Sequence, residues 1–171
     1  MMPETWEGRE VELSDRTLLT AAFDSALLYA TQVHGGQTRK GTPVPYVSHL
    51  LGVASLVLED GGDEEEAIAA LLHDACEDQG GWSRLLDIRA RFGDRVGDIV
   101  EALTDSFDQP KPPWRDRKEA YLEHLRNEKD QGVLRVSLAD KVNNSRAIVM
   151  DLRELGPSVW DRFNAGRDDQ L

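Results

Sequence analysis

The sequence predicts an all-α protein that folds as a single domain. Apolar residues recur three and four positions apart along most of the 171-residue chain, which is the spacing of one helix face. Glycine pairs at 35–36, 61–62 and 80–81 separate these segments and are typical of helix ends. A chain of this length is large enough to form one continuous core.

The expected helices follow one another with short connections. Ser14 and Ser48 are candidate N-caps, Asp63 with Glu66 resembles a capping box, and Ser83 marks a further helix start. The stretch 133–138 alternates imperfectly, as a strand would, but helical spacing continues to Leu152 and favours a helix. In chain order, we expect helices at 14–34, 48–60, 63–79, 83–92, 96–103, 114–127 and 133–152, with a short last helix opened by 156–158.

The remaining segments are predicted to be irregular. Residues 1–13 have no apolar period and are expected to form an N-terminal arm, while 165–171 form a polar tail. Glycines and prolines disfavour regular structure in the loops 34–46 and 105–113. We therefore predict one domain spanning 1–171.

Composition and charge exclude several classes of protein. The net charge of −12 and the pI near 4.7 argue against general nucleic-acid binding, which requires a broad basic surface. The single cysteine, Cys76, excludes an internal disulfide and suits a reducing compartment; we expect it to be buried. The N-terminus lacks the apolar core of a signal peptide, and no apolar run is long enough to span a bilayer. The expectation is a cytoplasmic protein without membrane partners.

The stretch 69–78 carries an unusual set of ionisable residues. Residues 67–72 are apolar all round, as in a helix enclosed by others, and His73, Asp74, Glu77 and Asp78 follow directly. If the helix continues, His73 lies above Glu77 and Asp74 above Asp78. Burial of such groups is costly unless they bind a metal ion or one another. We therefore predict a metal site that draws further ligands from elsewhere in the chain.

Two distant residues are candidates for those further ligands. His49 lies near the start of the second helix, and Asp140 follows an apolar stretch much as His73 does. The alternative for His49 is a capping or surface histidine, and the alternative for Asp140 is a salt bridge on a helix face. With His73 and Asp74 they form a set of two imidazoles and two carboxylates. Nitrogen and oxygen ligands without thiolate suit Mn²⁺, Fe²⁺ or Zn²⁺.

Longer motifs surround these residues, and together they resemble the HD-domain metal-dependent phosphohydrolases. The finer resemblance is to the (p)ppGpp hydrolase domain of the RelA/SpoT family and its short single-domain relatives, over roughly residues 18–150. The motifs are His34-Gly-Gly-Gln37-Thr-Arg39-Lys40, Pro45-Tyr46-Val-Ser-His49, the segment from Ala70 to Asp78, Phe92-Gly-Asp-Arg-Val96, and the segment from Leu138 to Asn144.

The resemblance implies an HD-domain helical bundle with the metal site between central helices. It implies one divalent ion, for which Mn²⁺ is preferred, held by His49, His73, Asp74 and Asp140. His34 and His124 are not needed as ligands. His124 is expected to be exposed on a charged helix.

The resemblance also assigns catalytic and substrate-binding roles. Glu77 and Asp78 are the implied catalytic pair, although Asp78 has the alternative of merely ending its helix. Arg39, Lys40 and Asn144 are the implied nucleotide-binding residues, and Lys111 falls where relatives place phosphate-binding cations. The alternative for Arg39 and Lys40 is an ordinary solvated loop. The alternative for Asn144 is a polar residue on a helix face, and that for Lys111 is a solvated charged surface.

The expected activity is removal of the 3′-pyrophosphate of (p)ppGpp, a small-molecule nucleotide substrate. A longer loop after Lys40 and the sequence Gln79-Gly80-Gly81 depart from the long RelA/SpoT enzymes. A phosphatase acting on another nucleotide or a phosphorylated dinucleotide is therefore the first alternative. A non-catalytic nucleotide-binding sensor is the second, and a helical interaction module is the third. The oligomeric state is left open.

Overall fold

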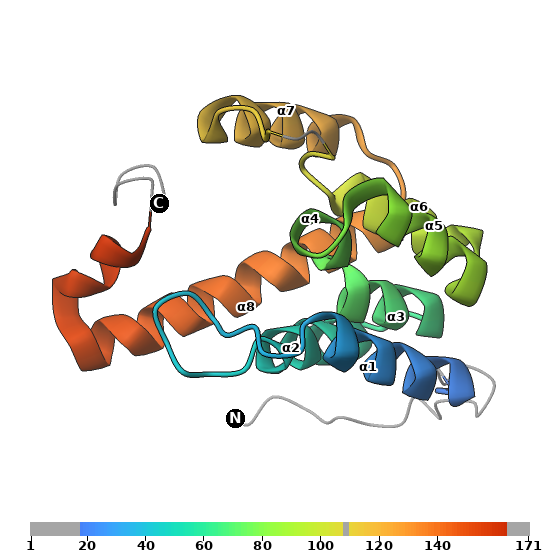
Figure 1. Ribbon diagram of the computed structural model, residues 1–171, viewed down its shortest axis with the longest axis horizontal. Coiled ribbons are helices and arrows are strands. Elements are labelled where there is room, and N and C mark those ends of the chain that lie inside the picture. The colour runs from blue at the N-terminus through green and yellow to red at the C-terminus, as the bar shows by residue number, and fades with distance from the viewer. Residues whose placement is uncertain (1–17, 108–109, 164–171) are drawn as a thin grey trace, which may run out of the picture.

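The computed structural model describes residues 18–107 and 110–163 and shows a helical bundle (Figure 1). The all-α prediction is confirmed, since the described residues contain helices and an isolated β-bridge between Thr38 and Pro45, but no strand. The helices are α1 (Ala21–Val33), α2 (Val47–Glu59), α3 (Glu64–Leu72), α4 (Ala75–Asp78), α5 (Gly81–Phe92), α6 (Asp94–Leu103), α7 (Trp114–Asn127), α8 (Gln131–Leu155) and the 3₁₀ helix η2 (Gly156–Arg162).

Helix α3 is the centre of the bundle. It packs against α1, α2, α6 and α8, and residues 66–72 are all buried. Its apolar side chains have no preferred face because neighbouring helices cover every side of it. The prediction of an enclosed central helix at 67–72 is confirmed, and the end of this helix is consequently placed deep inside the molecule.

The predicted helix starts have different outcomes. The capping box is confirmed: the Asp63 side chain accepts a bond from the Glu66 N–H, and the Glu66 side chain accepts one from the Asp63 N–H. Helix α1 starts only at Ala21, where Thr20 is the cap. Ser14 lies outside the described residues, as do the predicted arm 1–13 and tail 165–171.

Two predicted caps are wrong. Helix α2 begins before Ser48, at Val47, because the preceding Tyr46 already has helical backbone angles. Helix α5 begins at Gly81 rather than at Ser83. Its cap position is Gly80, whose φ of 134° favours glycine, so this turn replaces a serine cap.

The stretch 133–138 is helical, as predicted, within the 25-residue helix α8. The buried residues within 133–139 follow helical spacing, while Leu138 is exposed; they are Val133, Val136, Ser137 and Ala139. The short last element η2 is present, but as a 3₁₀ helix with a proline in its first turn.

The proposed continuity of the helix through residues 69–78 is wrong. Helix α3 ends at Leu72, and His73 and Asp74 connect it to the single turn of α4. Asp74 has φ −92° and ψ −4°, which lies in the bridge region and interrupts the helical bonding. His73 therefore lies in the connection and Glu77 in α4, although both side chains line the same cavity.

Within residues 18–107 and 110–163, no helix has both the length and the apolar character that crossing a membrane requires.

Candidate functional site

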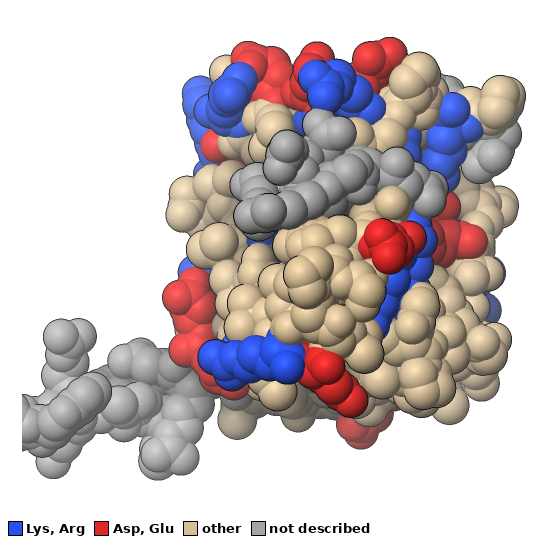
Figure 2. All heavy atoms as spheres, turned by 90° about the vertical axis from the view of Figure 1, so that its left-hand side faces the viewer, with Lys and Arg blue, Asp and Glu red and all other residues tan. Residues whose placement is uncertain are grey.

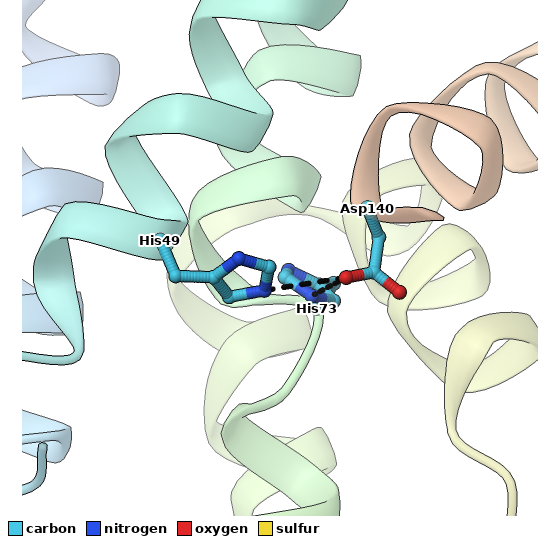
Figure 3. Close-up of side chains that lie close together, drawn as sticks. All are labelled: His49, His73 and Asp140. Atoms are coloured by element: carbon cyan, nitrogen blue, oxygen red, sulfur yellow. Dashed lines mark ion pairs between the residues drawn. The ribbon is translucent and has the colours of Figure 1, made fainter. Parts of the chain in front are cut away.

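Three of the predicted ligands converge from separate helices (Figure 3). His49 comes from α2, His73 follows the end of α3, and Asp140 comes from α8. One potential ligand atom of each lies within 4.8 Å of those of the other two. Asp140 Oδ1 is 3.3 Å from His49 Nε2 and 3.8 Å from His73 Nε2, and both imidazoles are buried. This three-residue cluster has the composition of a metal centre.

Asp74, the fourth predicted ligand, lies at the edge of this cluster. Its Oδ2 is 3.0 Å from His73 Nε2 and 3.6 Å from His49 Nε2. The same oxygen accepts a 2.5 Å hydrogen bond from the hydroxyl of Tyr46. Asp74 therefore contacts both imidazoles but does not belong to the compact group formed by His49, His73 and Asp140.

The other ring nitrogens of the histidines are held by hydrogen bonds. His73 Nδ1 lies 2.8 Å from the carbonyl oxygen of Ala70, which can only accept, so Nδ1 carries the proton. His49 Nδ1 is 2.8 Å from Asn143 Oδ1, and donation there is assigned in the same way. Each neutral ring therefore directs the lone pair of Nε2 towards the cluster. His73 Nε2 is buried and makes no hydrogen bond within the described part of the chain, although Asp74 Oδ2 is close.

The electrostatics of the cluster favour a positive charge. Burial by itself lowers the pKa of His73, but Asp74 and Asp140 outweigh it and raise that pKa well above its ordinary value. Burial conversely opposes ionisation of Asp140, yet the two histidines and Lys141 lower its pKa. Either a proton or a metal ion satisfies the carboxylates here. The orphaned Nε2 of His73 and the nitrogen and oxygen donors fit a divalent metal ion.

A cavity of about 230 Å³ opens beside the cluster. Glu77 lines it, and its Oε1 accepts a 3.0 Å bond from Lys111 Nζ. Burial and the negative charge of Asp105 raise the pKa of the Glu77 carboxyl, whereas Lys111 lowers it. Asp78 lines the same cavity and is exposed, and its Oδ2 accepts a 2.8 Å bond from Gln37. The cavity thus combines the cluster with carboxylates that can accept a proton.

The predicted substrate-binding residues are divided between two places. Lys111 reaches the cavity through Glu77. Arg39 lines a second cavity, of about 290 Å³, and its guanidinium donates a 3.0 Å bond to Asn144 Oδ1. Asn144 in turn donates a 2.6 Å bond to Asp140, and it lines the first cavity. Lys40 is exposed and lines neither cavity, so the structure does not bring it to the site.

Two expectations about non-ligand residues can be compared with the structure. Cys76 is buried, and burial raises the pKa of its thiol to about 11. His124 is exposed on α7 and lies 3.5 Å from Glu128. Both agree with the positions expected from the sequence. His34 is buried, stacks on Tyr46 and bonds to Gln37 through Nδ1, and it does not join the three-residue cluster.

Sequence reasoning missed several residues of the site. Tyr46 bonds to Asp74, Asn143 bonds to His49, and Asp105 and Lys118 line the first cavity. Tyr46 lies within a motif quoted above, and Asn143 adjoins Asn144, so nearness to motif residues was an available signal. No such signal marked Asp105, because its contacts depend on the path of the loop between α6 and α7.

The surface at the end of the molecule that carries η2 is mixed in charge (Figure 2). Cations and anions are interspersed around a largely uncharged centre. Among the described residues visible in this view, charges of one sign do not form an extended surface.

Comparisons with known proteins agree with this geometry. A sequence model described as HD domain matches residues 26–171. The protein named guanosine-3′,5′-bis(diphosphate) 3′-pyrophosphohydrolase MESH1, from Xenopus tropicalis, is 36% identical over 150 residues, which cover 86% of this chain and 76% of MESH1. The bifunctional (p)ppGpp synthase/hydrolase SpoT of Escherichia coli is 36% identical over 128 residues. That alignment covers 72% of this chain but only 17% of SpoT.

Solved structures are similar over most of the described fold. One, the structure of a metazoan ortholog of SpoT that hydrolyzes ppGpp, has a TM-score of 0.69 and 31% identity, and the match covers 78% of this chain and 74% of the other. The structure of lmo0812 from Listeria monocytogenes has a TM-score of 0.64 and 36% identity, with 71% and 75% covered. The chain therefore belongs to the HD-domain family.

Proposed function

We propose that this chain is a metal-dependent phosphohydrolase that removes the 3′-pyrophosphate of (p)ppGpp. The observation that carries the proposal is a pair of buried imidazoles and a carboxylate, with one orphaned ring nitrogen, beside a cavity lined by carboxylates and lysines. The 36% identity to MESH1 over 86% of the chain supports the choice of substrate.

The metal ion is proposed to bind His49, His73 and Asp140, with Asp74 completing the set. Family membership and the donor atoms support one divalent ion, and we propose Mn²⁺. Such an ion would polarise a phosphoryl oxygen and lower the pKa of a bound water molecule. Tyr46 would orient Asp74 through its hydroxyl bond.

The side chains around the ion are proposed to handle the proton and the substrate. Glu77 would accept a proton from the attacking water, since its raised pKa makes it a stronger base than an ordinary carboxylate. Asp78, held by Gln37, would assist in orienting that water. Lys111 would bind the pyrophosphate, which carries the charge that a lysine ammonium recognises.

The nucleoside end of the substrate is proposed to lie on the Arg39 side of the metal cluster. The guanidinium of Arg39 can stack on a purine, and its bond to Asn144 connects it to Asp140. Lys40, which lies in the same loop, is proposed to contact a phosphate only when substrate is present.

A substrate panel tests the proposal. Purified protein is incubated with ppGpp, other nucleotides and a phosphorylated dinucleotide, separately with Mn²⁺, Fe²⁺ and Zn²⁺. The expected result is release of pyrophosphate from ppGpp with Mn²⁺. Cleavage of another nucleotide but not of ppGpp would contradict the substrate, and tight binding without any cleavage would support the sensor alternative.

The hydrogen bond between Asn143 and His49 leads to a prediction about metal affinity. In Asn143→Ala, His49 loses the acceptor for its Nδ1 proton, so the ring is no longer held in one tautomer and orientation. The affinity for Mn²⁺ is expected to fall about 10- to 100-fold, as for other partners of metal-binding histidines. Calorimetric titration with Mn²⁺ measures this change. Ser145→Ala, an exposed change on the same helix, is the control, and equal affinities for the two variants would contradict the assigned role.

A further inference from the structure

The loop between α6 and α7 places a buried carboxylate between two cations. Asp105 Oδ2 accepts a 2.5 Å bond from Arg117 and a 2.8 Å bond from Lys118, both on α7. The side chain of Asp105 is only 2% exposed. Its second oxygen, Oδ1, is buried and has no hydrogen-bond partner among residues 18–107 and 110–163. A buried charge is tolerated when it is paired in this way.

One of these cations, Lys118, lines the first cavity, and the other, Arg117, contacts a carboxylate that lines it. Lys118 and Asp105 both line it, and the Arg117 guanidinium lies 3.7 Å from Glu77 Oε1, the oxygen that also accepts from Lys111. Lys111, Arg117 and Lys118 thus form a three-cation group, balanced here by Glu77 and Asp105. Cations grouped in this way match the charge and the oxygen acceptors of a diphosphate.

Few buried apolar side chains hold helix α7 in place, although Leu125 packs against the core. It lies at the edge of the molecule (Figure 1), and none of its residues is fully buried. Apolar burial is the dominant force that positions helices in a bundle. Because apolar burial is weak at α7, the position of this helix depends more on the bonds to Asp105 and on the hydrogen bond between Tyr121 and Ser137.

Asp105 itself is anchored on the body of the protein. Its neighbour Thr104 bonds to the Val100 carbonyl at the end of α6 through both its N–H and its hydroxyl. Two residues later, Phe107 stacks on Trp82 of α5 with ring centroids 4.1 Å apart. Burial by itself raises the pKa of Asp105, but Lys118 and Arg117 outweigh it and lower that pKa. The carboxylate is therefore both fixed and ionised at neutral pH.

We propose that Asp105 is a positioning residue, which holds Arg117 and Lys118 in the cavity so that they bind the pyrophosphate group of the substrate. The inference rests on the proposed function only for the identity of the substrate. The expected effect of losing Asp105 on pyrophosphate binding is opposite to the effect that simple electrostatics predicts. Removing a negative charge near an anion normally tightens binding, whereas loss of a positioning carboxylate weakens it.

The test measures the KM for ppGpp and the Kd for inorganic pyrophosphate in the Mn²⁺-loaded protein. In Asp105→Asn, both are expected to rise about tenfold, since one charge-assisted arrangement is lost, while kcat changes less than KM. Asp116→Asn removes the same charge from an exposed position next to Arg117 and is the matched control. Its KM and Kd are expected to stay unchanged or to fall slightly.

A second background separates positioning from charge. When Arg117→Ala and Lys118→Ala are already present, Asp105 has no cation left to position, so adding Asp105→Asn is expected to lower the Kd for pyrophosphate. A further rise in that background, or an unchanged Kd in Asp105→Asn alone, would overturn the inference. If Asp105→Asn fails to fold, Arg117→Ala decides, because an unchanged pyrophosphate Kd in that variant also overturns it.

Failure of the proposed function remains distinguishable. A wild-type protein that does not cleave ppGpp, but loses pyrophosphate affinity in Asp105→Asn and not in Asp116→Asn, would refute the substrate and support the role of Asp105. A wild-type protein without measurable affinity for pyrophosphate would overturn the role of Asp105.

Discussion

His73→Ala is expected to weaken metal binding strongly and to lower turnover by orders of magnitude. The imidazole is buried, its Nδ1 is fixed by the Ala70 carbonyl, and its unpartnered Nε2 faces Asp74 and Asp140. Removing it deletes a proposed ligand outright, so the affinity for Mn²⁺ should fall by more than the about 10- to 100-fold typical of a partner behind a ligand. Turnover of ppGpp is expected to fall on the order of 1,000-fold, or about 4 kcal/mol of transition-state stabilisation.

Metal content and activity together provide the measurement. The purified variant is analysed by elemental analysis after equilibration with Mn²⁺, and pyrophosphate release is then assayed. His124→Ala, an exposed change on α7, is the matched control and is expected to retain both properties. A His73→Ala protein that binds Mn²⁺ as tightly as the wild type would refute the proposed ligand set.

Glu77→Gln is expected to lower turnover by orders of magnitude while the metal ion stays bound. Glutamine has the same shape but cannot accept the proton, and Glu77 lies outside the cluster of His49, His73 and Asp140. General-base catalysis typically contributes about 100- to 10,000-fold, so kcat should fall by that range. The Kd for Mn²⁺ should change little. Single-turnover kinetics and metal titration of the same sample separate these effects.

The dependence of activity on pH provides an independent measurement of the same group. Burial and Asp105 raise the pKa of Glu77, so it loses its proton at a higher pH than an ordinary glutamate, whose pKa is about 4.3. Because a base must be ionised, kcat/KM should rise as pH increases through this raised pKa, and Glu77→Gln should lack that limb. The control is Glu119→Gln, an exposed change on α7. Unchanged turnover in Glu77→Gln would refute its role as the base.

Much of the helical arrangement could be predicted because its causes are local. The apolar segment 67–72 has no polar face, so it could only be an enclosed helix, and the capping box at Asp63 and Glu66 depends on residues three positions apart. The caps predicted at Ser48 and Ser83 were wrong because a serine is only favoured at a cap position and need not occupy one. Tyr46 and Gly80 start these helices through their own backbone conformations.

The residues of the His49, His73 and Asp140 cluster could be predicted for a different reason. Histidine and aspartate directly after apolar stretches signal buried polar groups that need partners, and this marked His73 and Asp140. The break between α3 and α4 could not be predicted from the sequence, because the backbone angles of Asp74 depend on contacts with distant residues. Tyr46 bonds to its carboxylate, and both imidazoles lie beside it.

The sequence by itself therefore determines which residues can carry chemistry. These are residue types that tolerate burial only in a metal site or an ion pair. Which of these residues act together is decided by tertiary structure. His49, His73 and Asp140 meet because α2, α3 and α8 pack together, and Asp105 reaches Arg117 and Lys118 because a loop folds back to the body. The physical reason is that the free energy of a buried charge depends on neighbours that are distant in the chain, and only the fold determines those neighbours.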